Sequence, residues 1–215
     1  MKVTHIGHAS FLVELKDKKF LFDPWVKGNE KAAFDIEEVK KMDADFVFVS
    51  HGHGDHGFAE AVEITRDTRA TAIGVFELIN ALTEKGGTGI GANIGGRFVE
   101  DGVEIYLANA AHSCPFANPC GFVVSYKGET VYHAGDTALI KDMELLPELF
   151  DMDVALLPAG GHFTMGPDEL KIARGMLKAK NYVAMHYGTF PAIEQDLKRI
   201  RELADVIGPG QSREY

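Results

Sequence analysis

One short stretch, FVFVSHGHGDHG at residues 46–57, constrains this chain more than any other. Its apolar half ends directly in His51, His53, Asp55 and His56, with glycines between them. Side chains two residues apart in extended backbone point to the same side, so His51 and His53 can face one ion. Histidines on a zinc-binding helix are spaced four apart instead. The pattern therefore predicts a buried strand that ends in metal ligands.

The residues around these histidines indicate more than one metal ion. We expect Gly52 and Gly54 to adopt positive φ and bring the backbone close to an ion. Asp55 and His56 precede a predicted helix, GFAEAVEITRD, and can face back across the turn. A single catalytic zinc ion usually keeps three protein ligands and one open position. Three imidazoles and a carboxylate exceed that number once ligands from elsewhere are added, so a second ion is predicted.

Composition and charge limit the class of protein. The 215 residues are 46% hydrophobic and 25% charged, which predicts one globular domain over residues 1–215. The net charge of −10 disfavours nucleic-acid binding. We find no signal peptide and no run of ~18 apolar residues. A soluble, cytoplasmic protein with a small-molecule substrate and no membrane contact is expected, while nothing indicates an oligomeric state.

Further potential ligands each follow a predicted strand. His112 lies between strands expected in residues 97–109 and 121–134, Asp136 follows the second of these, and His186 follows NYVAM. Ligands at the carboxyl ends of strands are typical of layered α/β folds.

Three other segments carry weaker predictions. The glycine-rich run at residues 85–96 lacks the order of a phosphate-binding loop, so we interpret it as a mobile turn. Helices are predicted near residues 138–150, interrupted at Pro147, and near residues 192–204. Cys114 and Cys120 are expected to be reduced thiols in a loop.

The segments HGHGDH, AAHSC, HAGDT and AMHYG, in this order, resemble the metal signature of the metallo-β-lactamase superfamily. The resemblance implies an α/β fold of four layers, an αββα sandwich. It also implies that seven side chains bind two ions. The first ion would take His51, His53 and His112, the second would take Asp55, His56 and His186, and Asp136 would bridge them.

Such a site predicts hydrolysis. Two divalent ions about 3.5–4 Å apart can share a hydroxide, lower its pKa and polarise a substrate oxygen. We expect attack by this bridging hydroxide, with Asp55 holding the second ion and orienting the proton of the nucleophile. Two divalent ions with Asp55, Asp136 and a hydroxide keep a small net positive charge, which favours an anionic ester, lactone or phosphodiester. Zinc is the expected metal, and manganese, nickel and iron suit the same ligands.

Longer segments narrow the resemblance. GDTALIKDM, ALLPAGGHFTMGPDEL and MHYGTFPAI are similar to a small branch of metal-dependent hydrolases that resembles L-ascorbate-6-phosphate lactonase. This branch implies catalytic or substrate-binding roles for His8 and His162, with hydrogen-bonded core histidines as the alternative. Asp23, in FDP, matches a carboxylate that fixes a ligand histidine, although an Asp-Pro turn explains it nearly as well. His5 and His133 are expected in the core or behind the ligands.

Two alternatives remain open at this stage: a non-catalytic metal-binding module and a redox member of the same fold. A flavin-linked diiron oxidoreductase normally carries H-x-E-x-D and a flavin domain, and neither occurs in this sequence. A true β-lactamase is disfavoured because Asp136 stands where those enzymes have cysteine.

Overall fold

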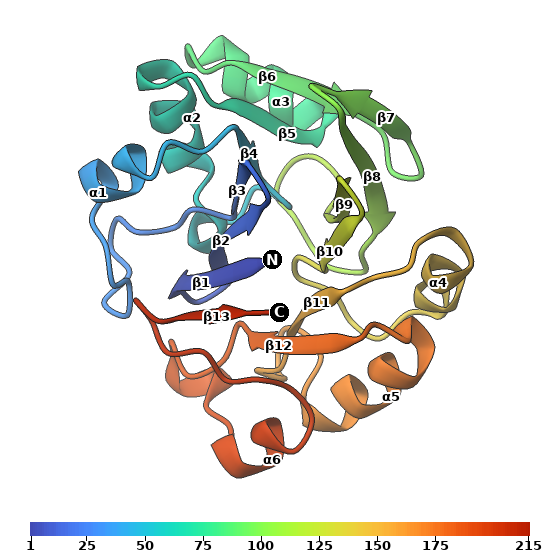
Figure 1. Cartoon of the computed structure of the whole chain (residues 1–215). Coiled ribbons are helices and arrows are strands. Elements are labelled where there is room, and N and C mark those ends of the chain that lie inside the picture. The colour runs from blue at the N-terminus through green and yellow to red at the C-terminus, as the bar shows by residue number, and fades with distance from the viewer.

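Two β-sheets lie face to face, and helices cover their outer sides (Figure 1). The computed structural model describes all of residues 1–215. The first sheet has seven strands in the order β13-β1-β2-β3-β4-β5-β6, and the second has six in the order β12-β11-β10-β9-β8-β7. The predicted four-layer αββα sandwich is confirmed.

Both sheets combine antiparallel and parallel pairs. The strands of the first sheet are β1 (Lys2–Gly7), β2 (Ser10–Leu15), β3 (Lys18–Phe22), β4 (Phe46–Phe48), β5 (Thr71–Val75), β6 (Gly89–Ala92) and β13 (Ser212–Glu214). Those of the second are β7 (Arg97–Glu100), β8 (Val103–Asn109), β9 (Cys120–Tyr126), β10 (Glu129–His133), β11 (Val154–Pro158) and β12 (Asn181–Met185). Pairs joined by tight turns are antiparallel, whereas β3 to β6 and β10 to β12 run parallel.

Helices connect the parallel strands, as crossover connections require. They are α1 (Ile36–Lys41), α2 (Phe58–Asp67), α3 (Phe76–Glu84), α4 (Leu146–Leu149) and α5 (Pro167–Leu177). A sixth helix, α6 (Leu197–Arg201), lies between β12 and β13, and the short 3-10 turns are η1 (Gly54–His56), η2 (Lys141–Leu145) and η3 (Pro191–Ile193). In Figure 1, α1 to α3 lie outside the first sheet, and α4 and α5 lie outside the second. No helix is both long enough and apolar enough to span a bilayer.

The core between the sheets is rich in phenylalanine. Phe22 on β3 stacks on Phe48 on β4, with ring centroids 4.8 Å apart. Phe48 also meets Phe122 of β9, in the opposite sheet, at 5.1 Å. All three side chains are fully buried. This packing holds the ends of β4 and β9 together, and the ligand-bearing loops begin at the same edge.

Asp35 caps the N-terminus of α1. Asp35 Oδ1 accepts a hydrogen bond from the backbone N–H of Glu38 at 2.8 Å, and Glu38 Oε2 accepts one from the N–H of Asp35 at 2.9 Å. This reciprocal capping box satisfies two helix-end donors.

The glycine-rich run at residues 85–96 was wrongly predicted as a mobile turn. It contains β6, which pairs in parallel with β5 at the edge of the first sheet. A Cβ at Gly89 would lie 2.9 Å from Ile79, and one at Gly91 would lie 2.9 Å from Phe76. Both neighbours belong to α3, so the glycines allow this helix to pack closely on an edge strand.

Two predicted helices are shorter than expected. Pro147 lies in the first turn of α4 rather than interrupting a helix, as its fixed φ allows. The helix predicted for residues 192–204 is reduced to η3 and α6, because Glu194 is extended and Asp196 caps α6 by accepting from the N–H of Lys198 at 2.9 Å. Strand β13, which pairs with β1, was not predicted, since its three residues are polar and exposed.

Candidate metal centre

Each ligand-bearing segment follows the carboxyl end of a strand. His51 comes shortly after β4, His112 after β8, Asp136 after β10 and His186 directly after β12. These strands come from both sheets, and their ends meet at one rim of the sandwich. The fold therefore brings together residues that are far apart in the sequence.

The first ligand group consists of His51, His53 and His112. His53 Nδ1 lies 3.0 Å from His51 Nε2 and 3.3 Å from His112 Nε2. Ligand atoms around a tetrahedral zinc ion, with Zn–N bonds of about 2.0–2.1 Å, lie about 3.3 Å apart. The three nitrogens therefore have the spacing that one such ion needs.

The second ligand group consists of Asp55, His56 and His186, and His8 joins the same cluster. One ligand atom from each of these four residues lies within 4.8 Å of the others. Carboxylate and imidazole donors in this combination suit zinc, manganese, iron or nickel.

Asp136 lies between the two groups. Its Oδ2 is 3.5 Å from His112 Nε2 of the first group, and 3.3 Å and 3.0 Å from Nε2 of His56 and His186 of the second. Its side chain is almost fully buried. One carboxylate oxygen thus faces imidazoles from both groups, which is the position that a bridging ligand would take.

Hydrogen bonds behind the ligands fix their orientation. Asp23, at the end of β3, accepts from His56 Nδ1 at 2.8 Å and from the backbone N–H and Oγ of Ser50, both at 2.7 Å. Because Ser50 donates its proton to Asp23, its oxygen can accept from His51 Nδ1 at 3.0 Å. Nε2 of both histidines is then left with a lone pair for an ion. The position predicted for Asp23 is confirmed.

The glycine with the unusual backbone in this turn is Gly57. Its φ is +70°, whereas Gly52 and Gly54 do not have positive φ, so that expectation was wrong. A Cβ at Gly57 would lie 2.5 Å from the carbonyl carbon of Pro24. Gly57 thus lets the ligand turn pack against the segment that carries Asp23. At Gly52 the reason for glycine is space, since an added Cβ would lie 2.6 Å from the ring of Phe116.

The pKa shifts of the histidines and of Asp136 favour cation binding in the site. Burial, and after it the charge of His56, lowers the pKa of His51 to about 2, and burial also lowers the pKa of His112. Burial alone would lower the pKa of His56, but Asp136 and Asp23 outweigh it and raise this pKa well above its usual value. Likewise burial would raise the pKa of Asp136, but His56 and His186 hold it well below its usual range. A divalent cation would take the place of the His56 proton.

Two unpartnered atoms support this fit. His56 Nε2 and Asp136 Oδ1 are buried and have no hydrogen-bond partner in the protein. Buried polar atoms without partners are costly, and a cation at this point would satisfy both. The donor set and the separations therefore fit metal ions.

A cavity of about 320 Å³ opens onto the centre. It is lined by His53, Asp55, His112, Ser113, Asp136, Phe163 and His186. Small molecules can therefore reach residues of both ligand groups, and Phe163, which is 54% exposed, forms an apolar wall.

The two additional predicted histidines differ in position. His8 is buried in the centre, where its Nε2 lies 3.4 Å from Asp55 Oδ2 and its Nδ1 is hydrogen-bonded to Thr189 Oγ1 at 2.8 Å. Burial lowers the pKa of His8 to about 4, so it is neutral at pH 7. His162 is exposed, contacts the Phe163 ring with centroids 4.4 Å apart, and is not among the residues that line the cavity. Its catalytic role stays a prediction.

Both cysteines are free thiols, as expected, but only Cys114 lies in a loop, because Cys120 is the first residue of β9. The backbone N–H of Gly52 donates to Cys114 Sγ at 3.2 Å, and this sulfur donates to the carbonyl of Phe116 at 2.8 Å. Cys114 thereby anchors its loop to the ligand turn. His5 and His133 are buried and hydrogen-bonded to backbone carbonyls, in accord with core roles.

Known proteins share both the sequence and this arrangement. A family model described as a β-lactamase superfamily domain matches residues 2–186. A UPF0173 metal-dependent hydrolase from Pelotomaculum thermopropionicum is 43% identical over 232 residues, which cover 100% of both chains. The chain belongs to the UPF0173 family of metal-dependent hydrolases. This family lies in the metallo-β-lactamase superfamily, so the predicted superfamily and the predicted enzyme class are confirmed.

Solved structures agree with this assignment. Igni18, a metallo hydrolase from the archaeon Ignicoccus hospitalis, is 37% identical, with a TM-score of 0.90 over 100% of this chain and 98% of its own. An isothiocyanate hydrolase from Delia radicum gut bacteria has a TM-score of 0.82 over 100% of this chain and 99% of its own at 20% identity, which shows a common fold.

Sequence reasoning missed several residues of the UPF0173 site. Ser50 links Asp23 to His51, and Thr189 holds His8. Thr137 Oγ1 accepts from the backbone N–H of Ala111 at 3.0 Å, which ties the His112 loop to the Asp136 loop. Each lies within three residues of a predicted ligand, and this proximity is the only signal that the sequence offered for them.

Proposed function

We propose that this enzyme binds two divalent metal ions, one on each ligand group with Asp136 between them, and hydrolyses a small anionic ester, lactone or phosphodiester. The observation that carries the proposal is the position of Asp136 Oδ2, within 3.5 Å of imidazole nitrogens from both groups. Bound ions of this kind polarise a carbonyl or phosphoryl group and make water a better nucleophile near neutral pH.

The chain's own residues supply orientation and proton transfer. Asp55 belongs to the second ligand group and lines the cavity, where its carboxylate can accept a proton from the attacking water. His8, held by Thr189, lies against the same carboxylate and fixes its orientation. Burial would raise the pKa of Asp55, but His8, whose Nε2 lies 3.4 Å away, and the charge of His56 lower it, so the carboxylate is ionised at neutral pH.

Charge and size define the substrate class that we propose. The two ligand groups and Asp136 contain only two carboxylates, so a pair of divalent ions leaves a positive centre that attracts an anionic group. The cavity of about 320 Å³ suits a small molecule. We include sugar-phosphate lactones among the substrates to be tested, because the sequence led us to expect a resemblance to L-ascorbate-6-phosphate lactonase.

A hydrolytic screen tests the proposal. Protein reconstituted with zinc or manganese is assayed with bis(p-nitrophenyl) phosphate, lactones and thioesters, and its metal content is measured in parallel. We expect Asp55→Ala to lose at least about 100-fold in kcat/KM, since general acid–base groups contribute about 10²–10⁴. Asp151→Ala is the matched control, because Asp151 is 85% exposed and only pairs with Lys180 on the surface. Equal turnover by wild type and Asp55→Ala would reject the role of Asp55.

A further inference from the structure

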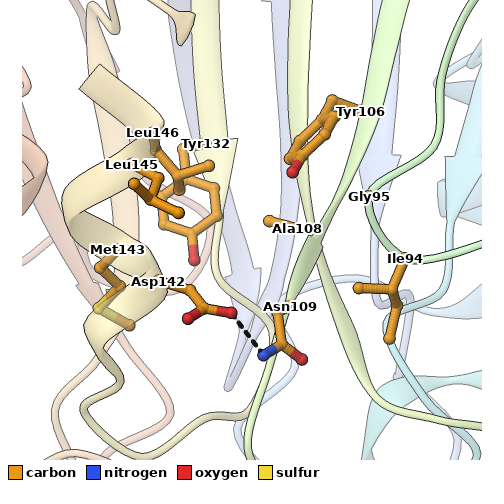
Figure 2. A pocket seen from close by; sticks show the side chains of 10 residues that line it. All are labelled: Ile94, Gly95, Tyr106, Ala108, Asn109, Tyr132, Asp142, Met143, Leu145 and Leu146. Carbon is orange, nitrogen blue, oxygen red and sulfur yellow. Dashed lines mark hydrogen bonds between the residues drawn. The ribbon is translucent and has the colours of Figure 1, made fainter. Parts of the chain in front are cut away.

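A second cavity, of about 370 Å³, lies over the outer face of the second sheet (Figure 2). Tyr106 and Ala108 on β8 and Tyr132 on β10 contribute to it from the sheet. Figure 2 shows η2 and the start of α4 on one side, with Leu145 and neighbouring side chains, and the loop that carries Ile94 on the other. No residue of this cavity lines the cavity at the metal centre.

A buried hydroxyl group in this cavity has no partner. Tyr132 is fully buried, and its OH makes no hydrogen bond within the protein. Burial raises the pKa of this phenol, so it keeps its proton and acts as a donor at neutral pH. Figure 2 shows the hydroxyl directed toward the end of the cavity where Asn109 and Asp142 meet. Buried donors are almost always satisfied, so a water molecule or a ligand in the cavity supplies the acceptor.

The polar end of the cavity carries a single charge. Asp142 Oδ2 accepts from Asn109 Nδ2 at 2.8 Å, and its other oxygen makes no hydrogen bond within the protein. No lysine, arginine or histidine lines the cavity. An anionic ligand would therefore meet only a like charge, in contrast to the anionic substrate proposed for the metal centre.

The rest of the lining is apolar. Ile94, Met143 and Leu146 contribute to it, and Leu145 does so although it is 62% exposed. A ligand with a hydrocarbon body would cover Leu145 and remove apolar surface from water.

We propose that this cavity binds a small uncharged molecule that carries a hydroxyl or primary amide group on an apolar body. The polar group accepts a hydrogen bond from Tyr132 and donates one to Asp142, while the body packs against Ile94, Met143 and Leu145. The site is separate from the metal centre and does not depend on the function proposed for it.

Methyl-detected NMR of the metal-loaded protein tests this site with four probes of equal chain length. Butanamide and 1-butanol carry the proposed group, whereas butanoate and butylammonium are charged controls. We expect saturable shifts of the methyl groups of Ile94, Met143 and Leu145 with the two neutral probes. Butanoate, which meets a like charge at Asp142, and butylammonium, which offers no acceptor to the Tyr132 hydroxyl, should both bind more weakly than either. Tyr132→Phe should weaken the binding of the neutral probes by about two- to tenfold, the effect of losing one hydrogen bond.

The matched control is Tyr182→Phe. Tyr182 lies on β12, and its hydroxyl donates to the carbonyl of Arg174, away from the cavity, so this variant should bind the probes as wild type does. A second variant, Ala108→Leu, fills the cavity and should abolish the shifts. Equal shifts with all four probes, no saturation, or unchanged affinity in Tyr132→Phe would overturn the proposal. A crystal soaked in butanamide that shows ordered water only at Tyr132 would also overturn it.

Discussion

Replacing Asp23 by asparagine changes one atom in the support of the second ligand group. Asp23 is 1% exposed, and its Oδ2 accepts from both His56 Nδ1 and Ser50 Oγ. Asparagine has the same shape and can keep the bond from the Ser50 backbone N–H to Oδ1. Its NH₂ group would then face two donors. His56 must release its Nδ1 proton to accept from it, which moves the imidazole proton to Nε2, on the side of the metal.

The size of the effect follows from this change of tautomer. A protonated Nε2 cannot bind a metal ion. Before an ion can bind, the His56 proton must therefore return to Nδ1, which breaks the hydrogen bond between Nδ1 and the asparagine amide. Loss of such a supporting carboxylate typically costs 10–100-fold in metal affinity or activity, which corresponds to about 1.4–2.7 kcal/mol. We expect one of two zinc equivalents to weaken by this factor, and kcat/KM to fall with it.

Competition with a chromophoric chelator measures both zinc affinities, and hydrolysis of the best substrate measures activity. The control is Asp45→Asn. Asp45 accepts from the backbone N–H of Lys19 at 2.9 Å and from Lys18 Nζ at 3.1 Å, at the amino end of β4, opposite the metal centre. This variant should keep both zinc affinities. Wild-type zinc affinity and activity in Asp23→Asn would refute the orienting role of Asp23.

Three further predictions concern the scaffold. Gly160→Ala should lower metal content and stability, because the new Cβ would collide with the carbonyl oxygen of His186. In Gly175→Ala the new Cβ meets no atom within 4 Å, so this variant should raise the free energy of unfolding, measured by thermal or urea unfolding, by about 0.5–1 kcal/mol. Burial lowers the pKa of His5, so below about pH 6.5 the unfolded chain binds a proton that the folded chain does not bind. The free energy of unfolding of the metal-free protein should therefore fall between pH 7 and 5, and it should fall less in His5→Phe. An equal fall in His5→Phe would show that His5 is charged in the folded state. Asp35→Ala should cost about 1 kcal/mol in urea unfolding through loss of the capping box, and an unchanged midpoint would contradict that role.

The clustering of the candidate ligands was the most predictable feature of the molecule, for a physical reason. The candidate ligands follow segments predicted as strands, and strand ends in such folds meet at one edge. Periodicity alone predicted a layered α/β fold, and the resemblance to the metallo-β-lactamase superfamily implied the four-layer sandwich. The pairing of His51 with His53 was predictable because their spacing already fixes their directions in extended backbone.

Other features depend on contacts that the sequence does not encode locally. Strand β6 exists because α3 packs tightly against its glycines, and no pattern within GIGA indicates this. Strand β13 is polar throughout and forms only because β1 offers it a free edge. Gly57 leaves no room for a Cβ because Pro24, which is more than thirty positions away in the sequence, packs against it. Such features follow from tertiary packing, which overrides local preference.

The number and position of the metal ions test the central claim most directly. Anomalous diffraction from crystals of the zinc-loaded enzyme, with elemental analysis of the same sample, gives both. The account predicts two ions per chain, one against each ligand group, with the Asp136 carboxylate in contact with both. A single ion held by only one group, or ions bound away from Asp136, would contradict it.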